Sequence, residues 1–145
     1  MKRVTTSPQF ESLLRAARRI ATSNGAEAIL ILAEVPYDFA EIVGMVRRTK
    51  LPDDFELPDG QKHLRLVVAS DKPDVQQAAR ADEVDLIPLL HEPQTRQIQI
   101  SQAIIDGVAE ELLRSGSRLV ALYAAFERDV IDSLSTTGEE RLAAR

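Results

Sequence analysis

The sequence predicts an α/β fold: a three-layer α/β/α sandwich with a mostly parallel sheet of four or five strands. Apolar runs of strand length alternate with segments of helical periodicity along the 145 residues. A helix therefore separates each strand from the next, and such crossovers join strands that run parallel. The length suits a single domain with its own core.

The first helix is predicted after residue 7. Ser7 is a suitable N-cap, Pro8 suits the first helical position, and Gly25 is a natural stop. The stripe that recurs at helical spacing consists of Leu13, Ala17, Ile20 and Asn24.

A strand buried on both faces is predicted at residues 28–33, which form a continuous apolar run. A second helix follows, because apolar residues return at helical spacing from Phe39 to Val46. Residues 51–62 contain two prolines, four acidic residues and a glycine, so they are predicted to form an exposed loop.

The second half of the chain repeats this alternation. A strand at 64–69 precedes a short helix that Ser70 or Asp71 could cap, and a third strand follows at 84–90. Pro88 lacks a ladder donor, so the third strand should lie at an edge or end early. The remaining predicted elements are a helix at 95–114 stopped by Gly116, a strand at 119–125 and a weak strand at 130–134.

The long helix carries two apolar stripes. One consists of Ile98, Ile105, Ala109 and Leu112, and the other of Ile100, Ile104 and Val108. Two interpretations stay open: the helix is buried within the domain, or it also forms an interface with another domain or subunit. For the second interpretation, the candidate interface residues are Ile100, Ile104 and Val108.

Composition excludes several classes of function. The formal net charge is −5 and only six residues are aromatic, which disfavours nucleic-acid binding. The chain has no cysteine and two histidines, so we expect no metal site and no disulfide, and we expect no cofactor. The apolar runs are too short to span a bilayer, and no signal-peptide core follows the basic start; we expect a cytoplasmic protein without a membrane partner.

Candidate ligand-binding residues follow the first two strands, because open α/β sheets bind ligands beyond the carboxyl ends of their strands. These candidates are Glu34, Tyr37, Asp38, Ser70, Asp71 and Lys72. The turn from Ser70 to Lys72 offers a hydroxyl and a cation to an anion, although an ordinary helix cap would look the same. No glycine-rich phosphate loop and no nucleophile elbow occurs, so we predict no catalytic residue.

The order and lengths of the elements resemble the C-terminal domain of pyruvate kinase. The matching segments are residues 28–33, 66–70, 84–89, 98–113 and 119–124. The resemblance implies a sheet whose last strand runs antiparallel. It does not imply an effector-phosphate site, because the turn at 34–38 lacks the serine, threonine and glycine that the family uses there.

A closer resemblance involves residues 117–123 and 129–135. They are similar to the junction at which a pyruvate-kinase-like domain precedes a diadenylate cyclase domain of the DNA-integrity-scanning type. The cyclase signatures, Asp-Gly-Ala and Arg-His-Arg, are absent from this chain. The resemblance thus implies a non-catalytic N-terminal part of a cyclase. Residues 1–135 would form the domain, and residues 136–145 a tail or the start of a linker to a C-terminal domain.

Three functional hypotheses follow. The leading one is an accessory domain for oligomerisation or regulation in cyclic-di-AMP signalling, with self-association or a fused cyclase domain as its partner. The alternative is a stand-alone sensor that binds a small molecule or nucleotide at the strand ends. The third, an independent enzyme, has no group of nucleophile, base and orienting residue to support it.

Overall fold

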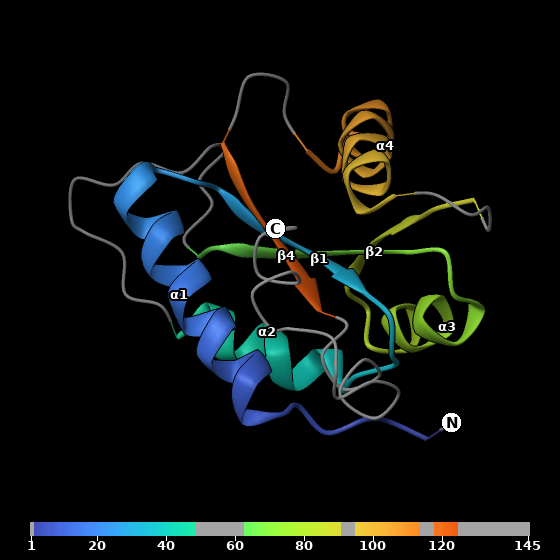
Figure 1. The fold of residues 1–145 in the computed structure, drawn as a ribbon, viewed down its shortest axis with the longest axis horizontal. Helices are drawn as coiled ribbons and strands as arrows, with labels where there is room; N and C mark the ends of the chain where they lie inside the picture. Colours follow the sequence, from blue (N-terminus) through green and yellow to red (C-terminus); the bar gives the residue numbers. More distant parts are fainter. Residues whose placement is uncertain (1, 49–62, 91–94, 114–117, 125–145) are drawn as a thin grey trace.

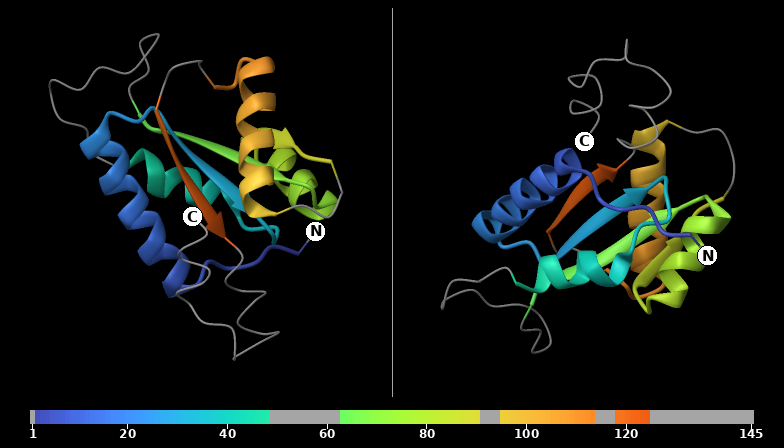
Figure 2. Two further views of the ribbon diagram at one scale, coloured as in Figure 1. Left: turned by 45° about the horizontal axis from the view of Figure 1, so that its top comes forward. Right: turned by 90° about the horizontal axis from the view of Figure 1, so that it is seen from below.

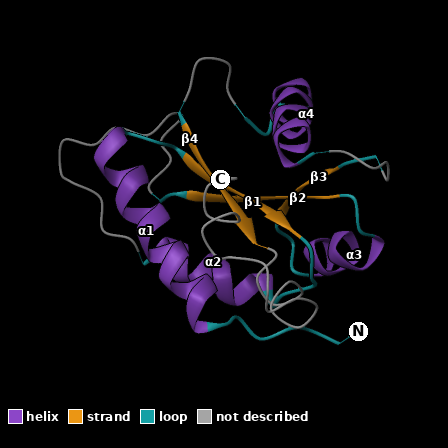
Figure 3. Cartoon of the chain, viewed as in Figure 1, coloured by secondary structure: helices purple, strands orange, loops and turns teal. Residues whose placement is uncertain are grey.

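The computed structural model describes residues 2–48, 63–90, 95–113 and 118–124. Helices and strands alternate as predicted (Figure 3). In chain order they are α1 (Pro8–Asn24), β1 (Ala28–Ala33), α2 (Phe39–Arg47), β2 (Arg65–Ser70), α3 (Pro73–Ala81), β3 (Asp85–Pro88), α4 (Arg96–Ala109) and β4 (Leu119–Ala124). The sheet has the order β3-β2-β1-β4 (Figure 1).

The three layers of the sandwich follow from the alternation of side chains along the strands. Ile29 and Ile31 of β1 join one core with α1, α2 and α3, whereas Leu30 and Leu32 join a second core on the opposite face with α4. Figure 2 shows α4 by itself on its side of the sheet. Every residue of β1 is buried, as the continuous apolar run predicted.

The last described strand runs parallel to its neighbour, which corrects the expectation of an antiparallel last strand. β4 pairs with β1 in parallel register, from Ala28 beside Leu119 to Ala33 beside Ala124. The physical reason is the crossover: α4 carries the chain from one edge of the sheet back to the start of β1, so β4 begins at the same end. The weak strand predicted at 130–134, the loop at 51–62 and the boundary at 135 lie outside the described residues.

The predicted ends of α1 and the predicted edge position of β3 are confirmed. The Ser7 side chain accepts a hydrogen bond from the Phe10 N–H, and Gly25 ends α1 with a φ of 68°, a conformation that suits glycine. β3 lies at the sheet edge and ends at Pro88. The buried stripe of α1 differs from the prediction, because Phe10, Leu14, Ala17 and Ala21 face the core while Ile20 is half exposed.

α4 is shorter than predicted, and neither of its apolar stripes forms its main contact with the sheet. It buries Gln99, Ala103 and Gly107. Small residues let the helix lie close to the sheet: a Cβ on Gly107 would come within 2.6 Å of Leu113 and 3.0 Å of Ile87. The helix ends at Ala109, well before Gly116. Past that end, the chain folds back so that the N–H groups of Leu112 and Leu113 both reach the Gly107 carbonyl.

Candidate functional site

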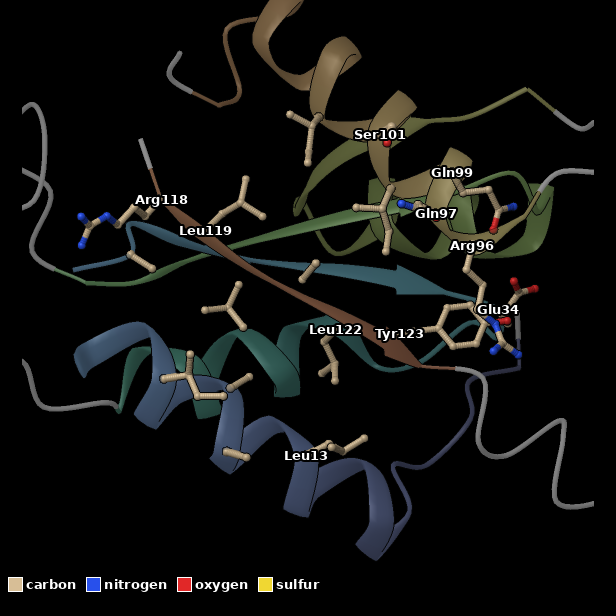
Figure 4. Close-up of a pocket in the computed structure, with 18 of the residues that line it drawn as sticks. Leu13, Glu34, Arg96, Gln97, Gln99, Ser101, Arg118, Leu119, Leu122 and Tyr123 are labelled. Carbon is tan, nitrogen blue, oxygen red and sulfur yellow. The ribbon is translucent and has the colours of Figure 1, made fainter. Parts of the chain in front are cut away.

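The strand order places the candidate site beside the end of β1. The chain proceeds from β1 through β2 to β3 in one direction and then returns to place β4 on the other side of β1. Open α/β sheets bind ligands at such a switch point, outside the carboxyl ends of the strands. A hollow of about 1780 Å³ runs along β4 to this point, where Glu34, Arg96 and Tyr123 line it (Figure 4).

We call the end of this hollow beside β1 the crevice. Its sheet side carries both signs of charge. Lys72 follows β2, and its Nζ atom lies 3.7 Å from Oε2 of Glu34, the residue after β1. The same Nζ lies 3.6 Å from Oδ1 of Asp71, whose side chain is largely buried. The wall formed by Glu34, Asp71 and Lys72 therefore holds two carboxylates and one ammonium group.

The N-terminus of α4 also lines the crevice. Thr95 caps it by accepting a hydrogen bond from the Ile98 N–H at 3.2 Å. Arg96, the first residue of the helix, places its guanidinium 4.2 Å from the centre of the Tyr123 ring, a cation–π contact with the end of β4. The partial positive charge of a helix N-terminus has the same sign as the guanidinium of Arg96.

Gln99 is a polar residue on the buried face of α4. Only 8% of its surface is exposed, and it lines the crevice.

Three of the six candidate residues predicted from the sequence lie together in the crevice: Glu34, Asp71 and Lys72. The structure gives Ser70 a local role, since its hydroxyl accepts a hydrogen bond from the Lys72 N–H at 3.0 Å. No side chain caps α3, so neither Ser70 nor Asp71 is the predicted cap.

Tyr37 and Asp38 are placed away from the crevice lining. The Tyr37 ring is fully buried and stacks on Phe10 with a centroid distance of 4.8 Å. It also meets the edge of Phe39 at 6.1 Å. Asp38 caps α2, where its carboxylate accepts a hydrogen bond from the Glu41 N–H at 3.3 Å. Both residues stabilise the start of α2.

Sequence reasoning missed Arg96, Gln99 and Tyr123 as site residues. A signal for Gln99 was present, because it shares one helical face with Ala103 and Gly107. Small residues at that spacing mark a close packing face, and a glutamine on such a face is buried. For Arg96 and Tyr123 no local signal exists, since they meet only because α4 and β4 meet.

The remainder of the hollow is apolar. Leu13 and Ile20 of α1 line one side of β4, and Ile100 and Ile104 of α4 line the other. The whole hollow exceeds the roughly 300–1,000 Å³ of small-molecule sites. A small ligand would therefore fill only the charged end.

Neither a metal site nor a membrane-spanning helix occurs in the described ranges. No group of histidine and carboxylate side chains among these residues is placed to hold a metal ion. None of the helices described here combines the length and the hydropathy that crossing a bilayer requires.

The sheet order and the layered helices place the chain in the class of open, doubly wound α/β domains. The chain belongs to the family described as "Probable sensor domain DacZ_P", whose model matches residues 9–52 and 52–138. This description links the chain to the diadenylate cyclase DacZ and to a sensor role. No curated protein and no solved structure matches the chain. The pyruvate-kinase resemblance stays a prediction from the order of elements.

Proposed function

We propose that this chain is a non-catalytic sensor domain that binds a small effector in the crevice and regulates a diadenylate cyclase. The observation that carries the proposal is the meeting of Glu34, Asp71, Lys72, Arg96 and Gln99 at the switch point of the sheet. The family supports the regulatory half of the proposal. Ligand binding by α/β domains at this place supports the other half.

In this proposal, the cyclase domain lies C-terminal to this domain on the same polypeptide. An antibody against this domain should detect a native protein well above 16.1 kDa in the source cells. The immunoprecipitate should convert ATP to cyclic di-AMP. A band at 16.1 kDa with cyclase activity would indicate a separate partner subunit, and a precipitate without activity would contradict the link to a cyclase.

Replacing Asp71 by asparagine should change cyclase activity in the native protein by about fivefold or more, the lower range of allosteric coupling. The substitution keeps the shape of the side chain and removes one carboxylate from the crevice wall. The measurement is the rate of cyclic di-AMP formation at fixed ATP. Glu110→Gln is the matched control, because Glu110 is an exposed carboxylate just past the end of α4. Equal rates for Asp71→Asn and wild type would count against the crevice.

The outer face of α4 is proposed as the surface that transmits the signal. Ile98, Ile104, Ile105 and Val108 are all exposed, with Ile105 at 62%, whereas Ile100 is only half buried against the sheet. The partial exposure of Ile104 and Val108, two of the predicted interface residues, supports this part of the proposal. Such a surface suits contact with a cyclase domain or with a second copy.

Replacing Ile104 and Val108 by serine should disrupt that contact. Because the two residues are only 37% and 38% exposed, circular dichroism first checks that the double variant stays folded. Light scattering coupled to size-exclusion chromatography measures the mass of the native protein and of the variant. We expect the wild type to associate and the double variant to run as a smaller species. Equal masses for the two proteins, together with unchanged cyclase activity, would rule out an interface here.

A further inference from the structure

Three arginines from two helices meet beside the last turn of α2. Arg15 and Arg18 are one turn apart on α1, so their side chains share a face of that helix. Arg18 reaches across to α2, where its Nη1 group donates a hydrogen bond to the Met45 carbonyl. Arg48, the C-cap of α2, folds back along that helix, so that its Nη2 atom lies 3.8 Å from the place of a Cβ on Gly44. We call Arg15, Arg18 and Arg48 the arginine cluster.

No carboxylate in the described part of the chain forms an ion pair with this cluster. The ion pairs of the described residues belong to other cations, namely Arg3, Arg65 and Lys72. Within the described ranges, the cluster makes a single side-chain hydrogen bond, the one from Arg18 to α2. Each guanidinium has five N–H groups, so most of the donors in the cluster are available to a ligand.

The cluster concentrates positive charge on a chain that is acidic as a whole. Burial, and then the positive charges of Arg15 and Arg48, lower the pKa of Arg18. The charges that act on Arg18 are thus of its own sign, although the formal net charge of the chain is −5. Like charges at such spacing repel each other, and an anion bound among them would remove that repulsion.

The geometry of the cluster favours a phosphate group over other anions. A carboxylate neutralises one of the three guanidinium groups, whereas a phosphate monoester carries between one and two negative charges near neutral pH and several acceptor oxygens. The planar fork of N–H groups on arginine also matches the spacing of phosphate oxygens. The aromatic residues of α1 and α2, Phe10 and Phe39, are fully buried, so neither can stack on a nucleobase.

We propose that the arginine cluster is a second ligand site, which binds the phosphate group of a small phosphorylated molecule. Arg15 and Arg48 would contact the phosphate oxygens, and the Met45 carbonyl holds Arg18 in place beside them. This site goes beyond the proposed function, because the residues that line the hollow include none of the three arginines. Figure 2 shows α1 and α2 on the face of the sheet opposite α4, so a ligand here would join two helices that do not contact α4.

Titration calorimetry of the chain with pyrophosphate and tripolyphosphate at low ionic strength tests the site. Both should bind, and the affinity should fall as sodium chloride is added, because salt screens exposed charges. Arg15→Gln and Arg48→Gln should each weaken binding by about threefold or more, and the double variant by about tenfold or more. Both side chains are exposed, and circular dichroism checks that the variants stay folded.

Arg80→Gln is the matched control. Arg80 is an exposed arginine in the last turn of α3, so the substitution removes the same charge from another helix. Its affinity for tripolyphosphate should equal that of the wild type. Equal weakening by Arg80→Gln and Arg15→Gln would show a general attraction of anions and would overturn the site.

The other outcomes decide the class of ligand. No binding of either phosphate compound overturns the proposal, and equally tight binding of citrate overturns the preference for phosphate. An RNA oligonucleotide, or vesicles that contain phosphatidic acid, could bind more tightly than tripolyphosphate and lose affinity in the same variants. That result overturns the small-molecule assignment. None of these outcomes affects the crevice, whose test is the cyclase rate of Asp71→Asn.

Discussion

Replacing Gly107 by valine should lower the free energy of unfolding by about 3 kcal/mol, because it overpacks the contact between α4 and the sheet. A Cβ there would lie 2.6 Å from Cδ1 of Leu113 and 3.0 Å from Cδ1 of Ile87, and valine adds two methyl groups beyond it. Both neighbours are buried, so they cannot turn into solvent. Urea unfolding followed by circular dichroism measures the loss.

Gly44→Ala is the matched control in α2. Among the described residues, a Cβ at Gly44 would meet only Nη2 of Arg48, at 3.8 Å, which is ordinary contact. Alanine is a better helix former than glycine, so this variant should be more stable by about 0.5–1 kcal/mol. A Gly107→Val variant whose urea midpoint of unfolding equals that of the wild type would show that α4 does not pack closely on the sheet.

The same substitution connects packing to function. Gly107 shares its helical face with Gln99, and α4 begins at Arg96, so a helix pushed off the sheet carries both crevice residues with it. We expect Gly107→Val to weaken effector binding even where the protein remains folded. Gly44→Ala should leave binding unchanged, since α2 does not line the crevice.

Replacing Asp82 by alanine should cost about 2–4 kcal/mol, because it breaks a partly buried ion pair that also serves the backbone. Asp82 follows α3, and its Oδ1 accepts a hydrogen bond from Arg3 Nη2 at 2.9 Å. Its Oδ2 accepts one from the Phe39 N–H at 2.9 Å, at the start of α2. Arg3 also donates to the Tyr37 carbonyl at 2.9 Å. One carboxylate thus joins three segments that are distant in sequence.

The contribution of Asp82 to the free energy of unfolding should decrease at low pH. Burial raises the pKa of Asp82, but the hydrogen bonds from Arg3 and from the N–H groups of Phe39 and Ala40 lower it by more, so the pKa lies below its ordinary value. A lowered folded-state pKa stabilises the protein fully above the unfolded value of about 3.9. The stabilisation is lost as the pH falls through the folded-state pKa.

Urea unfolding at several pH values checks this expectation. The difference in free energy of unfolding between wild type and Asp82→Asn should be constant near neutral pH and should shrink below about pH 4. Asp85→Ala is the control, because the Asp85 side chain is 43% exposed and its 2.8 Å pair with Arg65 faces solvent. It should cost less than about 1 kcal/mol. Equal losses for the two alanine variants would contradict the role given to Asp82.

Local sequence determined which segments form helices and strands, and several of their ends. Ser7 and Gly25 bound α1 because a hydroxyl cap and a left-handed glycine satisfy the helix ends locally. The apolar run of β1 predicted burial on both faces, because both sets of alternating side chains are apolar. Pro88 predicted an edge strand, because proline has no N–H group to donate to a neighbouring strand. The rule on strand ends gave all six candidate ligand residues, of which Glu34, Asp71 and Lys72 line the crevice.

Tertiary structure alone decided the rest. The parallel direction of β4 depends on where α4 crosses the sheet, and the buried face of α4 depends on how closely small residues let it approach. The crevice joins Glu34, Lys72, Arg96 and Tyr123, which are separated by more residues than any periodicity can relate. Patterns of three or four residues describe one element and its burial, whereas a binding site requires the packing of several elements against each other.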